Sequence, residues 1–366
     1  MPLVDLASAD ADLRRRLTAA FERVLRSGHY VAGAEAARFE EALSARLGVP
    51  GAVGVASGTA AVALALRGAG VRPGDEVILP ANTFFATLEA VLWCGAVPVL
   101  ADVDPESAGI DPLAAEAAVT ARTSALIAVH LYGIPADMDR LRAVAERHRL
   151  ILVEDAAQAM GATWCGTPIG ATADVAAHSF FPTKNLGALG EAGAVTTGDV
   201  TIAERVRALA NHGQSTKNLH LEVGFNERID ELQAALLTVK LERLDLDLAR
   251  RRRLAEAYAA LIAGIAGVTT FSVPEPAEPA YHLFVIRVPA RDAVLGALLR
   301  RGIGAAVHYP TPLHLQPACH FLGQPAGAFP AAEALASSVL SLPFFPTLSR
   351  QQLERTVSAL AEAVSG

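Results

Sequence analysis

Between residues 50 and 200, short stretches rich in Val, Ile and Leu alternate with longer stretches whose apolar residues recur at helical spacing. This alternation is typical of a parallel sheet whose strands are joined by crossover helices. The predicted strands cover residues 77–80, 97–103, 125–131, 150–154, 175–180 and 193–197. The predicted helices cover residues 59–67, 83–93, 112–120, 138–148 and 202–211. The pattern therefore predicts an α/β domain.

A different pattern follows. Residues 226–262 keep helical spacing for much longer than an average helix, so we expect this stretch to bridge two domains. The proline-rich residues 273–279 then interrupt regular structure. After them a strand is predicted over residues 281–288 and a helix over residues 290–301. These elements indicate a smaller α+β domain.

The length of 366 residues is too great for one ordinary core and too small for three. We predict a large domain over residues 1–245 and a smaller one over residues 246–366. Hydrophobic residues make up 52% of the chain, yet no stretch offers about 20 strongly apolar residues in a row. The first 16 residues carry acids and arginines, unlike a secretion signal. We therefore expect a cytoplasmic protein with no membrane partner.

Charge and cysteine content exclude further classes. The net charge is −7, and basic residues are interspersed with acidic ones, which argues against nucleic acid as a partner. A short basic run at 250–253 is interpreted as the solvated side of a helix. Cys94, Cys165 and Cys319 are too scattered for a disulfide framework or for the close pairs of a zinc site. We expect them to be reduced and structural.

Candidate chemistry begins at the sequence VGVASGT, residues 53–59, which runs from a strand into an Ala-rich helix. Gly58 and Thr59 would lie at the N-terminus of that helix, where free backbone amides and the helix dipole favour a phosphate. Small residues also cap helices that bind no ligand, so both interpretations stay open from these residues alone.

Two further residues add to this picture. Asp155 ends an apolar strand, where ligands bind in open α/β sheets, although a carboxylate there can also cap a following helix. Lys184 follows another strand and has apolar and small neighbours, so its amine should lose solvation and become able to form an imine. A phosphate cradle, an acid for a pyridinium nitrogen and a desolvated lysine are what a pyridoxal-phosphate site needs.

With these residues the chain resembles the DegT/DnrJ/EryC1/StrS sugar aminotransferases over nearly its full length. That family has the fold type I aspartate aminotransferase architecture, a large, mixed but mostly parallel sheet domain followed by a smaller C-terminal α+β domain. The matching segments are SGHYVAG at 27–33, FE at 39–40, SGT at 57–59, PGDEV at 73–77, TFFA at 83–86, VHLYG at 129–133, EDAAQA at 154–159, SFFPTKNLG at 179–187, GFNER at 224–228, HYP at 308–310 and LP at 342–343.

The resemblance implies roles around a pyridoxal phosphate ring. Lys184 would be the Schiff-base lysine and would also shuttle protons, while Asp155 would keep the ring nitrogen protonated. Gln158 would hydrogen-bond the phenolic oxygen of the cofactor. Phe84 would stack on the ring face, although a core aromatic residue is an equal interpretation of this position.

The resemblance also implies a phosphate site shared between two chains. Gly58, Thr59 and Ser179 would bind the cofactor phosphate together with Asn226 from the other subunit of a homodimer. Each active site would therefore need both chains. Asn226 can also be interpreted as a cap of the helix that follows it, and both roles can hold at once.

Substrate contacts are expected in a loop rich in His and Pro. His308, Tyr309 and His314 lie where the family places contacts to the sugar nucleotide. A zinc site at His308, His314 and His320 is possible by spacing but lacks a helix-based pairing, and we expect no metal. Many family members have tyrosine where this chain has Phe181, so a hydroxyl group is missing there.

The expected reaction is transfer of an amino group to a nucleotide-linked keto-sugar, with L-glutamate as the amino donor. The run 302–317 is similar to that of members acting on dTDP-linked 3-keto-6-deoxyhexoses. A 4-keto sugar is an alternative, because such members share most of the core. Sugar dehydratases of the family typically have histidine in place of Lys184, which argues against that class. A regulatory protein of the same fold would be expected to lose the chemical residues, which are present.

Overall fold

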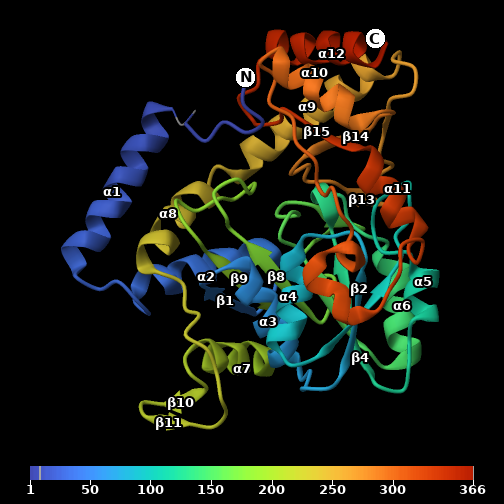
Figure 1. The fold of residues 1–366 in the computed structure, drawn as a ribbon. Helices are drawn as coiled ribbons and strands as arrows, with labels where there is room; N and C mark the ends of the chain where they lie inside the picture. The colour runs from blue at the N-terminus through green and yellow to red at the C-terminus, as the bar shows by residue number, and fades with distance from the viewer. Residues whose placement is uncertain (8–9, 366) are drawn as a thin grey trace.

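The computed structural model describes residues 1–7 and 10–365. A seven-stranded sheet forms its centre (Figure 1). In spatial order the strands are β1 (Gly51–Val55), β9 (Gly193–Thr197), β8 (Val175–Ser179), β5 (Ile151–Asp155), β4 (Thr123–Val129), β2 (Glu76–Pro80) and β3 (Val97–Ala101). Only β9 runs antiparallel to its neighbours. The sheet is thus mixed and mostly parallel, as the sequence predicts.

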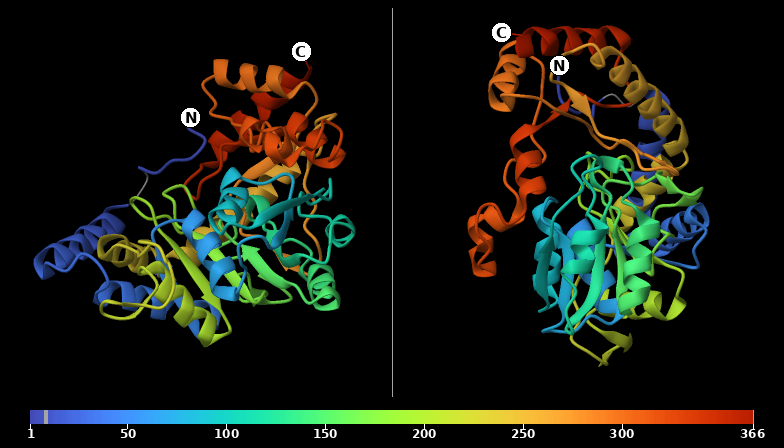
Figure 2. Two further views of the ribbon diagram at one scale, coloured as in Figure 1. Left: turned by 60° about the horizontal axis from the view of Figure 1, so that its bottom comes forward. Right: turned by 90° about the vertical axis from the view of Figure 1, so that its right-hand side faces the viewer.

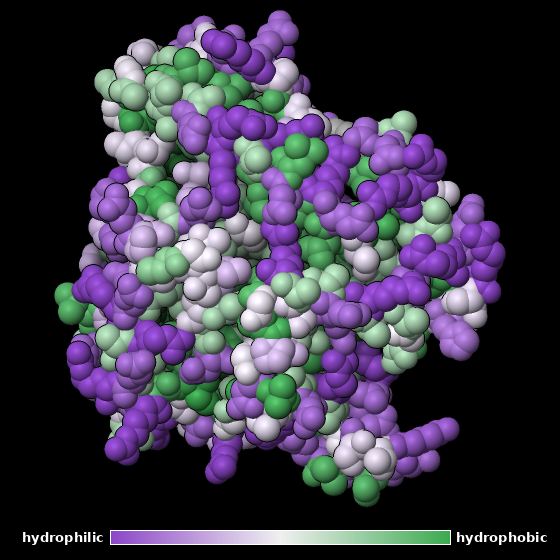
Figure 3. Space-filling model, turned by 180° about the vertical axis from the view of Figure 1, so that it is seen from behind, coloured by the Kyte–Doolittle hydropathy of each residue, from purple (hydrophilic) through white to green (hydrophobic). Residues whose placement is uncertain are grey.

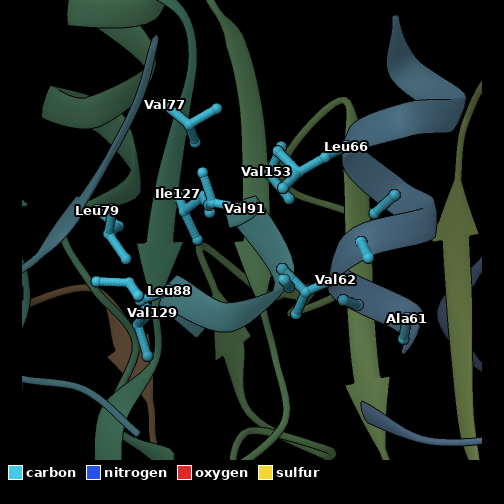
Figure 4. Close-up of a cluster of buried hydrophobic side chains, with 14 of the residues drawn as sticks. Ala61, Val62, Leu66, Val77, Leu79, Leu88, Val91, Ile127, Val129 and Val153 are labelled. Carbon is cyan, nitrogen blue, oxygen red and sulfur yellow. The ribbon is translucent and has the colours of Figure 1, made fainter. Parts of the chain in front are cut away.

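Helices cover both faces of this sheet. One face packs against α3 (Gly58–Ala69), α4 (Phe85–Trp93) and α7 (Val200–Ala210). The other packs against α2 (Ala34–Leu47), α5 (Pro112–Ala117), α6 (Met138–His148) and α8 (Glu231–Leu241). Figure 4 shows the first core, in which side chains of α3 and α4 meet those of β2, β4 and β5. The predicted strands and helices of this region form, with ends shifted by a few residues.

A second, smaller lobe has its own core. It consists of α9 (Leu244–Ile262), α10 (Arg291–Arg300), α12 (Arg350–Ser365) and a sheet of β12 (Thr269–Thr270), β14 (Phe284–Arg287) and β15 (Val339–Leu342). The right-hand view of Figure 2 shows this lobe apart from the large sheet. The division of the chain after residue 245 stays a prediction.

The expected long helix over residues 226–262 is wrong in two respects. The chain is helical only from Glu231, and the helix is interrupted between α8 and α9. The basic run at 250–253 is also not wholly solvated. Arg251 is buried because it donates to the carbonyls of Tyr281 and His282, both at 3.2 Å, and lies over the ring of Phe344.

Short elements complete the fold. A small sheet contains β6 (Thr163–Trp164), β7 (Thr167–Pro168) and β13 (Ala277–Glu278), so the proline-rich segment is not wholly irregular. The 3₁₀ turns are η1 (Leu131–Gly133), η2 (Leu313–Leu315) and η3 (Pro317–Leu322). The segment with η2, η3 and α11 (Pro330–Ser338) reaches from the small lobe along the large one (Figure 1). It is fixed there because Asp102 accepts hydrogen bonds from the backbone of Ala331 and Ala332.

The N-terminal region joins the two lobes. Helix α1 (Ala11–Ser27), which the sequence analysis does not predict, packs through Ala20 and Val24 against α8. The preceding chain end lies on the small lobe, where the Met1 ammonium donates to the carbonyl of Gly302 at 2.6 Å. Both termini therefore lie close to the small lobe (Figure 1).

A hairpin of β10 (Gln214–Thr216) and β11 (Leu219–His220) projects from the large lobe. Leu219, Leu221 and Val223 are exposed on and beside it. Figure 3 shows hydrophobic atoms on the segment that projects at the foot of the molecule. The three cysteines are free; Cys94 and Cys319 are buried and Cys165 is exposed. Over the described residues, every helix is too short or too polar to cross a bilayer.

Candidate active site

A cavity of about 430 Å³ lies where the parallel strands end, and both lobes line it. Nine of the eleven residues predicted for the site line this cavity: Gly58, Thr59, Phe84, Asp155, Gln158, Ser179, Lys184, His308 and Tyr309. The structure does not bring Asn226 or His314 to it. Residues as far apart in the sequence as Ser57 and Tyr309 thus line one cavity.

The N-terminus of α3 forms one wall of the cavity. Ser57 caps the helix by accepting from the amide of Ala60 at 3.1 Å, which leaves the amides of Gly58 and Thr59 at the open end. A Cβ on Gly58 would lie 2.6 Å from the Cβ of Ser179. Only glycine therefore lets the helix end and the end of β8 approach this closely. The result is a set of backbone donors beside a serine hydroxyl, which suits a phosphate group.

Asp155 ends β5 and is buried. One carboxylate oxygen accepts from the Thr87 hydroxyl at 2.8 Å, and the other accepts from the amide of Ala157 at 3.1 Å. The alternative that Asp155 caps a following helix is wrong, because the chain turns after β5 without forming one. Thr87, on α4, was missed by the sequence analysis, since a threonine inside an apolar helix carries no distinctive signal.

Lys184 lies in the loop that follows β8. Burial disfavours its ammonium form and lowers its pKa to about 8, although the nearby carboxylate of Asp155 acts in the opposite direction. Side chains of other segments fix the loop. Lys240 donates to the carbonyl of Gly187, and Asn185 donates to the carbonyl of Ala280 at 3.0 Å. The loop that carries Lys184 is therefore held in place by α8 and by the segment after β13, whose Ala280 packs in the core of the large lobe.

Gln158 lies between the two lobes. Its carbonyl oxygen accepts from the amide of Tyr132 at 2.6 Å, and its amide nitrogen donates to the hydroxyl of Tyr309 at 3.2 Å. The ring of Phe84 is 55% exposed, with its centroid 5.5 Å from that of Tyr309. The interpretation of Phe84 as a core aromatic residue is therefore wrong. An exposed ring at a cavity wall is available to stack on a flat ligand.

His282 is a cavity residue that the sequence analysis missed. It is buried, and its Nδ1 atom has no hydrogen-bond partner among the described residues. Burial lowers its pKa well below the usual value, and the positive charges of Lys184 and Arg251 lower it further. His282 is consequently neutral in the cavity. A histidine within a predicted strand gives no indication of this placement.

Asn226 lies on the surface outside the cavity, where its side-chain oxygen accepts from Arg228. It does not cap α8, because the residue in the cap position is Asp230. This segment runs beside β1, where Ala56 donates to the carbonyl of Glu227 at 3.1 Å. A role of Asn226 in the same chain's cavity is thus excluded by position.

The loop histidines have separate surroundings. His308 bonds through Nδ1 to the hydroxyl of Ser341 at 2.7 Å, and burial lowers its pKa to about 4. His314 is buried and pairs with Glu333 at 2.9 Å, away from the cavity. Within the described part of the chain, no three His, Cys, Asp or Glu residues are arranged to hold a metal. Phe181 is exposed at the cavity wall.

A mixed α/β sheet that presents a phosphate cradle, a buried carboxylate and a lysine of lowered pKa to one cavity defines a fold type I pyridoxal-phosphate enzyme. The chain belongs to the DegT/DnrJ/EryC1/StrS aminotransferase family, whose sequence profile matches residues 11–361. It is a pyridoxal-phosphate-dependent aminotransferase. The cradle fits the cofactor phosphate because Gly58, which has no Cβ, lets the N-terminus of α3 lie directly beside the hydroxyl of Ser179.

Relatives support this assignment over almost the whole length. The chain is 47% identical to a dTDP-3-amino-3,4,6-trideoxy-alpha-D-glucose transaminase of Streptomyces venezuelae, covering 99% of this chain and 96% of that protein. It is also 47% identical to the erythromycin biosynthesis sensory transduction protein EryC1 of Saccharopolyspora erythraea, covering 98% of each.

Solved structures agree. The crystal structure of DesV from Streptomyces venezuelae, in complex with a ketimine intermediate, matches with a TM-score of 0.97 and 46% identity. The match covers 100% of this chain and 98% of that one. Other matching structures of lower identity were determined in pyridoxal phosphate or pyridoxamine phosphate forms.

We predict that Gly58→Ala weakens cofactor binding about tenfold or more, because the new methyl group forces α3 away from Ser179. The measurement is an absorbance titration of the apoprotein with pyridoxal phosphate. Gly198→Ala is the matched control, since a Cβ there meets nothing within 4 Å, and its affinity should equal that of the wild type. Equal affinity of the Gly58 variant and the wild type would contradict the cradle.

Proposed function

We propose that the enzyme transfers an amino group from L-glutamate to the keto carbon of a dTDP-linked 3-keto-6-deoxyhexose. The observation that carries the proposal is the meeting of Lys184 and Asp155 with His308 and Tyr309 in one cavity. The first pair supplies aminotransferase chemistry, and the second lies within reach of the charge of Lys184, in a segment that His308 ties to Ser341 of the small lobe. The sugar therefore has a place beside the reactive amine.

The family resemblance assigns the cofactor-binding roles in this proposal. The amides of Gly58 and Thr59, with the hydroxyl of Ser179, would hold the phosphate. Asp155 would bind the protonated ring nitrogen, with its carboxylate oriented by Thr87. Gln158 would hydrogen-bond the phenolic oxygen, and Phe84 would stack on the ring. When bound, pyridoxal phosphate supplies a carbonyl group that exchanges amines and a ring that accepts electrons.

Lys184 handles protons in this scheme. A lysine with a pKa of about 8 is partly the free amine near neutral pH, whereas an ordinary lysine is almost wholly charged. The free amine is the form that accepts a proton from the carbon that loses nitrogen, and the ammonium form delivers one to the carbon that gains nitrogen. The carboxylate of Asp155 keeps the pKa from falling further, so Lys184 can also return the proton.

The sugar side of the cavity is formed by His308 and Tyr309. Burial and the charge of Lys184 lower the pKa of His308 to about 4, so it is a neutral hydrogen-bonding group at neutral pH. Phe181 offers an apolar surface where many family members have a hydroxyl group. An apolar wall favours a deoxygenated sugar carbon over one that carries a hydroxyl.

Names of relatives support the position of amination. The transaminase of Streptomyces venezuelae is named for a 3-amino sugar carried on dTDP. A relative from Aneurinibacillus thermoaerophilus, 40% identical, is named for dTDP-3-amino-3,6-dideoxy-alpha-D-galactopyranose. Both names describe a nitrogen at carbon three of a 6-deoxy sugar. We extend this chemistry to the present chain.

A second candidate is a regulatory role. The relative from Saccharopolyspora erythraea is named a sensory transduction protein, and one from Geobacillus stearothermophilus, 41% identical, a pleiotropic regulatory protein. A purely regulatory chain has no need of a desolvated lysine opposite a buried carboxylate. Retention of Lys184 and Asp155 therefore favours catalysis.

The proposal is tested by following the two half-reactions separately by absorbance. L-glutamate should bleach the visible band of the holoenzyme, and a dTDP-3-keto-6-deoxyhexose should then restore it. Lys184→Ala should do neither at a comparable rate, because its proton carrier is missing. If the 4-keto isomer restored the visible band faster than the 3-keto sugar, the 4-keto isomer would become the proposed substrate. Indifference to every amino donor would favour the regulatory role.

We further propose that the active site is shared in a homodimer, with Asn226 of each chain binding the cofactor phosphate of the other. The segment of Asn226 is exposed and adjoins β1, on the side of the large lobe where the hairpin β10–β11 projects. The exposed apolar residues of that hairpin are consistent with burial against a second copy.

Complementation tests this sharing. Lys184→Ala and Asn226→Ala should each have little activity as separate proteins. Unfolded and refolded together, they should recover about a quarter of the wild-type activity, since half of the dimers are mixed and one site in each is intact. In the same refolded sample, capture of dimers through a tag on one variant measures the mixed fraction. No recovery of activity when half of the dimers are mixed would exclude a shared site.

A further inference from the structure

The turn after β4 holds a tyrosine in an unusual conformation. Tyr132 is buried and has φ 62°, in the left-handed region that bulky residues rarely adopt. Such a conformation persists where the surroundings hold it in place. The contacts that hold Tyr132 come from three separate parts of the cavity wall.

Each polar group of Tyr132 reaches a different segment. Its amide donates to the side chain of Gln158 at 2.6 Å, and its carbonyl accepts from the amide of His282 at 2.8 Å. Its hydroxyl donates to the carbonyl of His308 at 2.5 Å. The next residue, Gly133, has φ 86°, and a Cβ there would lie 2.7 Å from the nitrogen of His282. The turn therefore passes tightly between the large lobe and the small lobe.

The bond to His308 closes a ring of contacts across the cavity. Gln158, which accepts from Tyr132, donates in turn to the hydroxyl of Tyr309 at 3.2 Å. His308 and Tyr309 are thus tied to the large lobe by two hydrogen bonds. The third tie, between His308 and Ser341, holds them to the small lobe. Their distance from Lys184 is set by these bonds and not by the loop alone.

We propose that Tyr132 is a positioning residue for the sugar half-reaction, in which its hydroxyl fixes the His308–Tyr309 segment relative to Lys184. The inference rests on the proposed function, because it assigns this segment to the sugar. Tyr132 itself does not line the cavity. The amino-donor half-reaction depends on Lys184 and Asp155, neither of which bonds to the Tyr132 hydroxyl, so that half-reaction should be insensitive to its loss.

The test compares two holoenzyme variants that each lose a buried tyrosine hydroxyl. Tyr132→Phe should raise the KM for the keto-sugar about tenfold, because the His308 carbonyl loses its donor and the segment loosens. The rate with L-glutamate should stay within about twofold. Tyr258→Phe is the matched control: Tyr258 is buried and donates to the carbonyl of Pro343 at 2.9 Å, outside the cavity. Its KM should be unchanged.

Amide hydrogen exchange on the same proteins gives a readout independent of the sugar. Peptides spanning residues 304–315 should exchange faster in Tyr132→Phe than in the wild type or in Tyr258→Phe. Unchanged exchange, an unchanged KM, or an equal effect on both half-reactions would overturn the positioning role. Failure of the wild type to use any keto-sugar would instead refute the proposed function. The hydrogen-exchange data would then still decide whether the Tyr132 hydroxyl restrains the His308–Tyr309 segment.

Discussion

The ammonium group of Lys184 loses much of its hydration where β8 ends, and burial there lowers its pKa to about 8. The surrounding fold creates this condition. Helix α8 and the segment after β13 hold the lysine loop through Lys240 and Asn185, and β5 places the carboxylate of Asp155 at the same edge of the sheet. Near neutral pH such an amine exists in both its free and its protonated form. It can therefore accept a proton and return one, as reversible amino transfer requires.

The fold was predictable from the chain because hydrophobic period and turn residues are local signals. The strands β2, β3, β4, β5, β8 and β9 and the helices between them were found, and so were Asp155 at the end of β5 and Lys184 in the loop after β8. The family resemblance then supplied residues such as Gln158, whose position no local pattern reveals. Helix α1 was missed although local signals mark both of its ends, since Asp10 caps its N-terminus and Gly28 follows its C-terminus in the left-handed conformation.

What local patterns could not predict depends on contacts between distant segments. No proline or glycine in the sequence marks the interruption between α8 and α9. Burial of Arg251 depends on carbonyl groups 30 residues away in sequence. In the sequence, Thr87, His282 and Tyr132 cannot be distinguished from ordinary core residues. Only the folded arrangement of the strands brings them to the site. The family resemblance also placed His314 with His308, whereas in the structure His314 pairs with Glu333.

The central claim is that Lys184 alone forms the covalent bond with the cofactor, and reductive trapping tests it most directly. The chain has only three lysines, Lys184, Lys217 and Lys240, so mapping is unambiguous. Holoenzyme would be reduced with borohydride, digested, and the modified peptide identified by mass spectrometry. The account predicts one equivalent of cofactor on the Lys184 peptide and none on the other two. Label on Lys217 or Lys240, or no label on a protein that retains cofactor, would contradict it.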